Sequence, residues 1–414
     1  MTTYLTPGVY VREVPSGARP IQRVGTSTAG FVGVAPDSNA RVNEIVAVEG
    51  WPRFVDTFAD VDDPQPTALA LAVQGFFDNG GRRLHIVNLG SEDAEITGPR
   101  QGLSLFEAVD ELAIVAAPGR TDIESYQALI THCEKMEDRF AILDAPADVD
   151  RVERLTEVAT AEPTTSRRSE RGDEDEDTTS EGGGGGGGLS GAGGYRPPNS
   201  THAAVYFPQV VVGNPFGPGQ VTAPASGSLA GIYARTDATR GVHKAPANEP
   251  VRGALNLTYR VTREEQGVLN PRGVNCLRYF PAEGIMVWGA RTLADAASEY
   301  LYVPVRRLVN MLKESIAEGT RWVVFEPNDY QLWNRIRRDV RAFLTRVWRD
   351  GALMGRTPDE AFFVRCDEQT NPPESVDAGE VRCVIGIAPV KPAEFVIFEI
   401  THTERGVEAG EGES

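Results

Sequence analysis

The chain has 414 residues, 41% of them hydrophobic, and a formal net charge of −18. Its length predicts two or three domains, and its hydrophobic content is ample for packed cores. The strong negative charge argues against nucleic-acid binding as the main role.

No targeting segment or membrane span is expected. The N-terminus has neither a basic stretch nor an apolar stretch behind it, so no secretory signal is predicted. No uninterrupted apolar run approaches the roughly 18 residues that a spanning helix needs. We therefore expect the chain to be made and folded in the cytoplasm.

Residues 1–20 contain few helix formers, and prolines stand at positions 7, 15 and 20. Between the first two prolines lies one predicted strand, formed by Val9, Tyr10, Val11, Arg12, Glu13 and Val14. A lone terminal strand is not stable by itself, so it pairs either within the molecule or with the sheet edge of a neighbouring copy. We call residues 1–20 the N-arm.

Hydrophobic runs alternate with helical patterns between residues 29 and 159, which is typical of an α/β fold. Strands are predicted at 29–35, 44–48, 83–89, 112–118 and 140–144. Helices are predicted at 51–58, 67–79, 103–110, 122–137 and 148–159. Because strands that alternate with helices pair in parallel, we expect a parallel or mixed sheet flanked by helices.

The composition changes abruptly at residues 162–194, which include a run of acids and seven consecutive glycines. Such a segment buries too little apolar area to offset its ordering entropy, so an outward-facing flexible insertion is expected. Beyond it we predict strands at 203–207, 277–280 and 285–288 and a helix at 222–237. Small residues in that helix permit close packing: Gly227, Ala230, Gly231 and Ala234.

The pattern of residues 284–403 predicts a packed α/β unit that ends in an exposed strand. Helices are predicted at 305–318 and 331–349, and strands at 362–366, 381–387 and 395–400. Two prolines precede the last strand and favour an extended approach to it. That strand is formed by Phe395, Val396, Ile397, Phe398, Glu399 and Ile400. We call residues 391–414 the C-arm.

The helix predicted at 331–349 combines an apolar stripe with a basic face. The stripe is formed by Trp333, Ile336, Val340, Phe343, Leu344, Val347 and Trp348. Arg338, Arg341 and Arg349 lie largely off it. On an acidic chain, such a basic face is either solvated or a docking surface for an acidic partner.

No catalytic site can be assembled from the sequence. The segment 25–29 is similar to the serine turn of subtilisin-like proteases, but Ser27 has no room upstream for the His and Asp that precede the serine in those enzymes. Asp144 follows a buried strand and could lie at the ligand-binding edge of the sheet. The alternative for Asp144 is a helix-capping or turn role.

No cofactor or metal site is expected either. The five histidines fit no metal-ligand spacing: His85, His132, His202, His243 and His402. The four cysteines lack a C-x-x-C spacing and are expected to be buried free thiols, with disulfides or a bound metal as the alternatives: Cys133, Cys276, Cys366 and Cys383.

Long segments in a fixed order resemble the tail sheath proteins of contractile phages, phage-like particles and contractile injection systems. They are Leu5-Thr-Pro-Gly-Val-Tyr-Val-Arg-Glu-Val, Pro224-Ala-Ser-Gly with Ala230-Gly-Ile-Tyr-Ala-Arg-Thr-Asp, Lys244-Ala-Pro-Ala-Asn-Glu, Leu269-Asn-Pro-Arg-Gly-Val-Asn, Trp288-Gly-Ala-Arg-Thr-Leu, Phe325-Glu-Pro-Asn-Asp, Gly351-Ala-Leu-Met-Gly and Ile387-Ala-Pro-Val-Lys-Pro-Ala-Glu-Phe. The resemblance covers nearly all of the chain outside residues 160–200.

The resemblance implies an α/β (α+β), multi-domain tail-sheath fold. Its parts would be the N-arm (1–20), an N-terminal sheath region (21–90) and a subtilisin-like α/β domain without protease activity (91–250, interrupted by 162–194). A C-terminal sheath core domain (251–390) and the C-arm (391–414) would follow.

The resemblance also implies a non-enzymatic structural subunit without cofactors. Copies would stack as rings into a helical sheath around an inner tail tube, and the sheath would contract to drive the tube through a target membrane. Both arms would add strands to sheets of neighbouring copies. Expected partners are further copies, the inner tube protein, and baseplate and cap or terminator proteins, without nucleic acid and without direct membrane insertion.

Under the same resemblance, Arg338, Arg341 and Arg349 are candidates for the contact with the inner tube. The particle would be assembled in the cytoplasm as part of a virion or a phage-tail-like particle that can be released. Two rival hypotheses stay open at this point: a non-contractile ring or tube scaffold, and an α/β hydrolase-like enzyme with Asp144 in its site.

Overall fold

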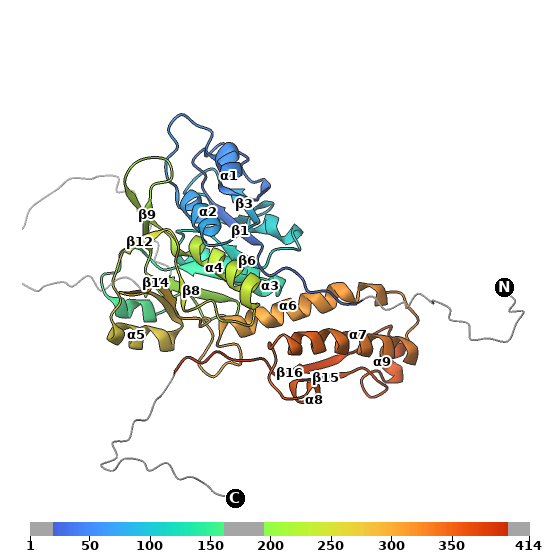
Figure 1. Ribbon diagram of the computed structural model, residues 1–414. Helices are drawn as coiled ribbons and strands as arrows, with labels where there is room; N and C mark the ends of the chain where they lie inside the picture. Colours follow the sequence, from blue (N-terminus) through green and yellow to red (C-terminus); the bar gives the residue numbers. More distant parts are fainter. Residues whose placement is uncertain (1–19, 161–193, 396–414) are drawn as a thin grey trace, which may run out of the picture.

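The computed structural model describes residues 20–160 and 194–395 (Figure 1). A large domain, residues 29–302, is built on a nine-stranded sheet. A smaller C-terminal unit, residues 303–390, combines two long helices with a two-stranded sheet. The predicted strand at 9–14, most of the insertion at 162–194 and residues 396–400 of the C-arm lie outside the described residues.

The large sheet is mixed, with the strand order β11-β14-β13-β8-β7-β6-β1-β3-β2. The strands from β13 to β3 are parallel to one another, and β2, β14 and β11 are antiparallel to their neighbours. The predicted α/β fold with a mixed sheet is confirmed. The strands are β1 (Ala29–Gly33), β2 (Ile45–Val48), β3 (Leu84–Asn88), β6 (Ile114–Ala116), β7 (Phe140–Asp144), β8 (Ala203–Phe207), β11 (Glu249–Pro250), β13 (Val274–Phe280) and β14 (Gly284–Trp288).

Helices cover both faces of this sheet, so its central strands are buried on both sides. One face packs against α2 (Ala68–Asp78) and α4 (Ala225–Arg240). The other face packs against α3 (Ile123–Met136) and the 3-10 helix η1 (Leu103–Ala108). The remaining elements of the domain are α1 (Trp51–Phe58), β4 (Thr97–Gly98), β5 (Gln101–Gly102), η2 (Val152–Thr156), β9 (Val210–Gly213), β10 (Gln220–Ala223), β12 (Ala254–Leu257), α5 (Arg263–Leu269) and η3 (Asn270–Arg272).

α4 lies in close contact with α2 because its small residues face that helix. A Cβ atom at Gly227 would lie 2.2 Å from the carbonyl oxygen of Ala72, and one at Gly231 would lie 2.4 Å from that of Phe76. The predicted close packing is therefore confirmed. The helix begins three residues later than predicted because residues 220–223 form β10, which pairs with β9, and Pro224 is the N-cap.

Two predicted helices are wrong in kind. The segment 103–110 is the 3-10 helix η1, which ends at Ala108. The segment 148–159 is helical only within η2. Its last residues are extended because they pair with the chain that follows the insertion: the amide of Ala159 donates to the carbonyl of Arg196 at 2.7 Å.

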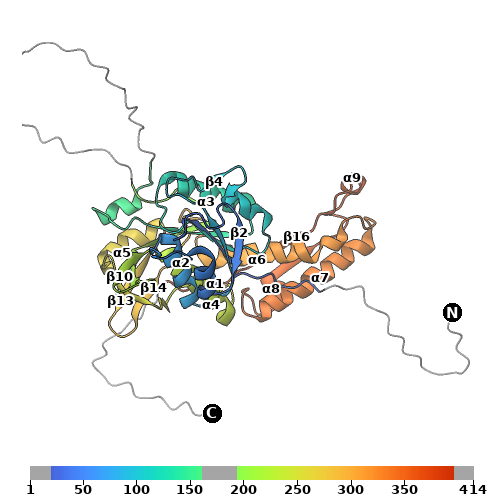
Figure 2. The ribbon, with the colours of Figure 1, turned by 90° about the horizontal axis from the view of Figure 1, so that it is seen from above.

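The C-terminal unit has its own hydrophobic core, which also buries Ile21 from the beginning of the described chain. Its elements are α6 (Val303–Gly319), η4 (Arg321–Val323), α7 (Tyr330–Arg349), α8 (Pro358–Ala361), β15 (Phe362–Arg365), α9 (Pro373–Asp377) and β16 (Val384–Ile387). Viewed from above, α6 extends out of the large domain with α7 beside it (Figure 2). None of the helices in the described ranges has the length and apolar composition that a membrane crossing requires.

Candidate functional site

β15 and β16 form an antiparallel pair in which Phe362 lies opposite Ile387 and Arg365 opposite Val384. The amide of Ala388 donates to the carbonyl of Ala361 at 2.9 Å. Since hydrogen-bonded and non-hydrogen-bonded pairs alternate along such a ladder, the backbone groups at positions 364 and 385 point away from the partner strand. No third strand joins this sheet within residues 20–160 and 194–395. Both outer edges therefore carry free backbone donors and acceptors.

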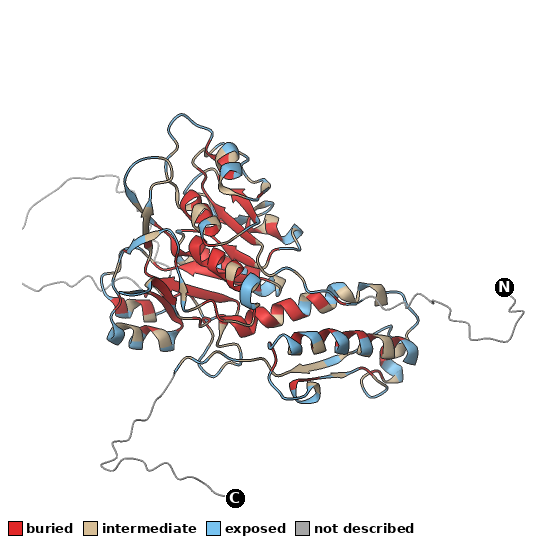
Figure 3. Ribbon diagram, in the orientation of Figure 1, coloured by how far each residue is buried: buried red, intermediate tan, exposed pale blue. Residues whose placement is uncertain are grey.

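This small sheet is covered on one face only. Phe362 and Val364 belong to the core that α7 closes. On the opposite face Phe363 is 51% exposed, its ring lies over Gly386, and the Arg365 guanidinium lies 5.9 Å from the ring centroid. Figure 3 shows the difference from the large sheet, whose central strands are buried throughout. A two-stranded sheet of this kind is marginal alone and suited to accept added strands.

The C-arm is anchored at its beginning by Glu394. The Glu394 carboxylate accepts hydrogen bonds from Arg291 at 2.6 Å, from Asn270 at 2.7 Å and from Tyr302 at 3.1 Å. Burial alone would raise the pKa of Glu394, but the bonds from Arg291 and Asn270 outweigh it and the pKa is lowered. The next residue, Phe395, is 74% exposed. The C-arm therefore leaves the body from a fixed, charged clamp on the large domain.

The residues that follow the N-arm are fixed in the same way, on the C-terminal unit. Ile21 is buried against Gly319 of α6, and its carbonyl accepts a hydrogen bond from Arg346 of α7. The amide of Val24 donates to the Ser315 hydroxyl at 3.1 Å. In Figure 1 this segment follows α6 outward, whereas the chain at residue 395 emerges on the opposite side of the molecule, near α5. The described chain thus begins and ends on opposite sides of the molecule.

A buried ion pair joins the two units behind these anchors. Arg307 of α6 donates to both carboxylate oxygens of Asp237 in α4, at 3.0 and 2.7 Å. Their side chains are 3% and 5% exposed. Arg307 also donates to the carbonyl of Thr26, whose hydroxyl donates to Asp237. Three segments distant in sequence therefore meet at one carboxylate.

α7 presents a basic outer face. Its predicted apolar stripe is confirmed, with every member buried except Trp348, which is half-buried. Arg338, Arg341 and Arg349 are exposed. Arg338 contacts Asp339 at 3.1 Å, and Arg341 pairs with Asp359. The three arginines therefore stay a prediction as a docking surface, because solvation alone also accounts for their exposure.

Asp144, the candidate of the enzyme hypothesis, has a structural role. It lies at the end of β7, and its carboxylate accepts from the Ser226 amide at 2.8 Å, the Ser226 hydroxyl at 2.6 Å and the Gly119 amide at 3.1 Å. Ser226 is in the first turn of α4. Burial raises the pKa of Asp144, and these hydrogen bonds oppose that effect. The helix-capping alternative for this residue accounts for its contacts.

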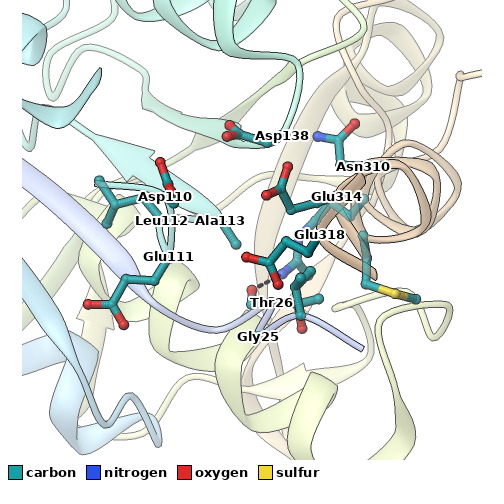
Figure 4. A pocket seen from close by; sticks show the side chains of 13 residues that line it. Gly25, Thr26, Asp110, Glu111, Leu112, Ala113, Asp138, Asn310, Glu314 and Glu318 are labelled. Atoms are coloured by element: carbon teal, nitrogen blue, oxygen red, sulfur yellow. Dashed lines mark hydrogen bonds between the residues drawn. The ribbon is translucent and has the colours of Figure 1, made fainter. Parts of the chain in front are cut away.

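An acidic pocket of about 200 Å³ lies between α6 and the segments 24–26 and 110–113 (Figure 4). Its carboxylates belong to Asp110, Glu111, Asp138, Glu314 and Glu318. Burial, followed by repulsion from Asp138, Glu318 and Asp110, raises the pKa of Glu314. Glu111 is paired with Arg83 and with His85 at 3.0 and 2.8 Å. The pocket concentrates negative charge, and the Thr26 hydroxyl that lines it donates to Asp237.

The remaining candidates also have packing roles. Burial, reinforced by Arg139, lowers the pKa of His132 to about 4, and burial next to Arg306 does the same for His202. Across the described ranges, no three His, Cys, Asp or Glu side chains are placed to hold a metal ion. Cys133, Cys276 and Cys366 are buried free thiols, as predicted, and Cys383 is half-buried.

Sequence reasoning missed the clamp at Glu394 and the junction at Asp237. Glu394 was only the residue before the predicted strand, and Asp237 was only the last residue of a helix. A charged residue within an otherwise apolar segment is the one signal that could have marked Glu394. The partners of both carboxylates are too distant in sequence to be paired without the fold.

Comparison with known proteins assigns the family. A model of the phage tail sheath protein central domain matches residues 95–293, and a model of the phage tail sheath C-terminal domain matches residues 295–403. The tail sheath protein of Vibrio phage KVP40 is 27% identical over 191 residues. That match covers 45% of this chain and only 28% of the phage protein.

Solved structures agree over the whole length. A chain of the anti-feeding prophage (AFP) baseplate superposes with a TM-score of 0.71 and 27% identity, covering 97% of this chain and 100% of the other. A chain of the PVC sheath complex in the contracted state, from an extracellular contractile injection system, gives a TM-score of 0.72 and 25% identity, with coverages of 98% and 99%. The resemblance predicted from the sequence is therefore confirmed, and the chain belongs to the tail sheath protein family of phage tails and contractile injection systems.

Proposed function

We propose that this chain is the repeating subunit of a contractile sheath. Copies polymerise helically around an inner tube, stitched together by their arms, and the sheath contracts to drive the tube through a target membrane. The observation that carries the proposal is the two-stranded sheet with two open edges, on a body that anchors both arms. The relatives support it, since one of them is a sheath complex in a contracted state.

The two open edges offer one docking place for each arm. Val364 on β15 and Ile385 on β16 direct their backbone groups outward, so strands 9–14 and 395–400 of two other copies can each extend the sheet by main-chain hydrogen bonds. The described chain begins and ends on opposite sides of the body, which favours two different neighbours. A contact that repeats without closing on itself generates a helix of subunits.

The body can move while the arms stay docked. Each arm is fixed at its root, by Glu394 or by Ile21, and rigid bodies that are linked through short tethers can adopt a second packing without dissociation. We assign the arms to this hinge, and the regions between them, 21–90, 91–250 and 251–390 with the small sheet, to the rigid body. No catalytic step is assigned.

The inner tube is the proposed partner of the exposed arginines of α7. All three arginines stay candidates, although Arg338 is paired with Asp339 and Arg341 with Asp359. Baseplate and cap or terminator proteins would hold the two ends of the sheath, and assembly would take place in the cytoplasm. A baseplate structure among the relatives supports the first of these partners.

The decisive experiment removes one outward-facing donor. Ile385→Pro deletes the amide at the open edge of β16 and leaves the ladder with β15 intact, whereas Ile385→Ala loses the side chain and keeps the amide. We expect tubes in negative-stain microscopy from the wild type and from Ile385→Ala, when each is co-expressed with the inner tube protein. Ile385→Pro should remain monomeric, like a chain that lacks residues 1–15.

Two outcomes would count against the proposal. Uniform tubes from Ile385→Pro would show that strand addition at β16 is not the contact that links the copies. Monomers from every chain, including the wild type with its tube, would remove the sheath function itself. The same assay tests the contact with the tube. We expect Arg338→Glu to lose assembly and Arg356→Glu, which changes another exposed arginine of the unit, to keep it.

A further inference from the structure

Cys366 and Cys383 face each other at the end of the small sheet. β15 ends at Arg365, which lies opposite Val384, the first residue of β16. The next pair along this register is Cys366 and Cys383. Because Arg365 and Val384 form a hydrogen-bonded pair, the cysteines occupy a non-hydrogen-bonded position, where Cα atoms lie about 4.5 Å apart and side chains approach most closely. A disulfide accommodates that separation.

Asn371 holds the strand in place beyond the last ladder bond. Its side chain accepts from the Arg382 amide at 2.6 Å and donates to the Arg382 carbonyl at 3.0 Å. The Asn371 side-chain nitrogen also donates to the Cys366 sulfur at 3.9 Å. Both cysteines contribute to the core beneath α7, so their side chains are on one face of the sheet. The register and the orientation that a disulfide requires are therefore both present.

The two thiols differ in accessibility and in acidity. Cys366 is 1% exposed, whereas Cys383 is half-buried. A hydrogen bond from the Cys383 thiol lowers the pKa of Cys366, against the effect of burial, and Asn371 adds to the lowering. The same hydrogen bond, with burial, raises the pKa of Cys383. Cys366 is thus the thiol that more readily supplies a thiolate, the form that attacks a disulfide.

We propose that Cys366 and Cys383 form a reversible thiol–disulfide pair. Both are free thiols in a reducing environment, and they form a disulfide when the chain reacts with a small disulfide such as glutathione disulfide. One cysteine thiolate attacks the glutathione disulfide, forms a mixed disulfide and releases one glutathione thiolate. The other cysteine thiolate attacks the protein sulfur of that mixed disulfide and releases the second. The two protein thiols lose two electrons and two protons, and one glutathione disulfide becomes two glutathione thiols.

The other two cysteines have no such arrangement. Cys133 is in α3 and Cys276 is in β13, and both are buried in the large domain. Burial raises the pKa of Cys276 to about 12 and also raises that of Cys133, which keeps both as unreactive thiols. They serve as internal controls for the proposed pair.

A disulfide here would join the two strands that, under the proposed function, receive the arms. It would fix the register of β15 against β16 while load passes through the docked strands. This consequence rests on the proposed function, but the pairing itself does not, because it can be measured on the purified chain before any assembly.

Peptide mapping provides the test. The full chain is incubated with glutathione disulfide or with a reductant, unfolded, alkylated and digested with trypsin, which cuts after Arg365 and Arg382. Cys366 and Cys383 are then the first residues of two separate peptides. A disulfide between them appears as two linked peptides in the oxidised sample only. We expect that link together with fully alkylated Cys133 and Cys276. Complete alkylation of all four cysteines, or a link that involves Cys133 or Cys276, would overturn the proposal.

A thermal melt gives a second readout. Oxidation should raise the Tm of the wild type by about 5 °C, because a short loop is closed in the unfolded chain. Cys383→Ser should show no oxidation-dependent shift in Tm, and its Cys366 should be either a free thiol or a mixed disulfide with glutathione. Cys133→Ser should shift like the wild type. If oxidised Cys383→Ser shifts as much as the wild type, the stabilisation does not come from this pair. A link found in wild-type monomers that form no tubes would uphold the pair and refute only the sheath assembly.

Discussion

The nine-stranded sheet of the large domain is covered on both faces and ends in short strands, whereas the two-stranded sheet of the C-terminal unit is covered on one face and open at both edges. β11, at one end of the large sheet, has only two residues, and short edge strands discourage pairing with other chains. β15 and β16 have four residues each, and both are edge strands within the described residues. Two of the nine strands of the large sheet are edge strands, whereas both strands of the small sheet are.

The difference shows how a subunit can be stable and still be ready to assemble. The large domain contains two hydrophobic cores, and the C-terminal unit combines a third core with the open strand edges. α7 covers one face of the small sheet, which stabilises these two strands within a single chain. A substitution in the large domain should therefore affect folding, and a substitution at the small sheet should affect assembly.

The largest effect is expected where the two units are joined. Asp237→Ala leaves the buried Arg307 guanidinium without its carboxylate and should lower the free energy of unfolding by about 3–5 kcal/mol. Glu44→Ala, which removes an exposed pair with Arg41, should cost at most about 1 kcal/mol. Urea unfolding followed by circular dichroism measures both. Equal losses would show that the junction does not couple the units.

Two helical glycines should respond with opposite sign. Gly227→Ala places a methyl group against the backbone of α2 and should destabilise the large domain by about 1–3 kcal/mol. Gly267, in α5, has nothing within 4 Å of a built Cβ, so Gly267→Ala should stabilise by about 0.5–1 kcal/mol. Thermal melts of the two variants would settle the sign. A stable Gly227→Ala would mean that the contact between α2 and α4 is looser than described.

The clamp at Glu394 should act locally rather than globally. Because hydrogen bonds lower the pKa of this carboxylate, its contribution is present above the usual glutamate range and is lost as the pH falls through the lowered value. Glu394→Gln should make amide exchange at residues 388–395 about tenfold faster near neutral pH, equivalent to about 1.4 kcal/mol. Glu380→Gln, which removes an exposed ion pair with Arg382, is the control. Unchanged exchange in Glu394→Gln would remove the clamp as an anchor.

The sequence predicted best the elements whose hydrophobic period was long and regular. Residues 140–144 and 203–207 form strands with the predicted bounds, and the apolar stripe of α7 is buried as expected. The segment 148–159 failed because its last residues pair with residues beyond the insertion, a contact that helical propensity cannot show. Long-range pairing overrode a local preference there.

The candidate site was predictable only in part. The arm strands stay a prediction, because residues 9–14 and 396–400 lie outside the described residues. The open edges of the small sheet could not be predicted, since the outward direction of the backbone groups of Val364 and Ile385 depends on the register of β15 against β16. The same register brings Cys366 opposite Cys383, although their spacing in the sequence suggested unrelated thiols. Chemistry that arises from strand register becomes visible only once the sheet is known.

The smallest expected effect concerns the acidic pocket beside the junction. Burial and neighbouring carboxylates raise the pKa of Glu314 above its usual value of 4.5. The folded state therefore binds this proton more tightly than the unfolded state, and stability is lost as the pH rises from that value through the raised one.

Glu314→Gln removes the cost of holding a charged carboxylate at this position. It should match the wild type near pH 4 and exceed its free energy of unfolding near pH 7 by less than about 1 kcal/mol, because the side chain is only half-buried. Glu299→Gln, an exposed carboxylate outside the pocket, should show no such pH-dependent gain. A gain of equal size for Glu299→Gln would indicate that net charge, rather than the pocket, sets the response.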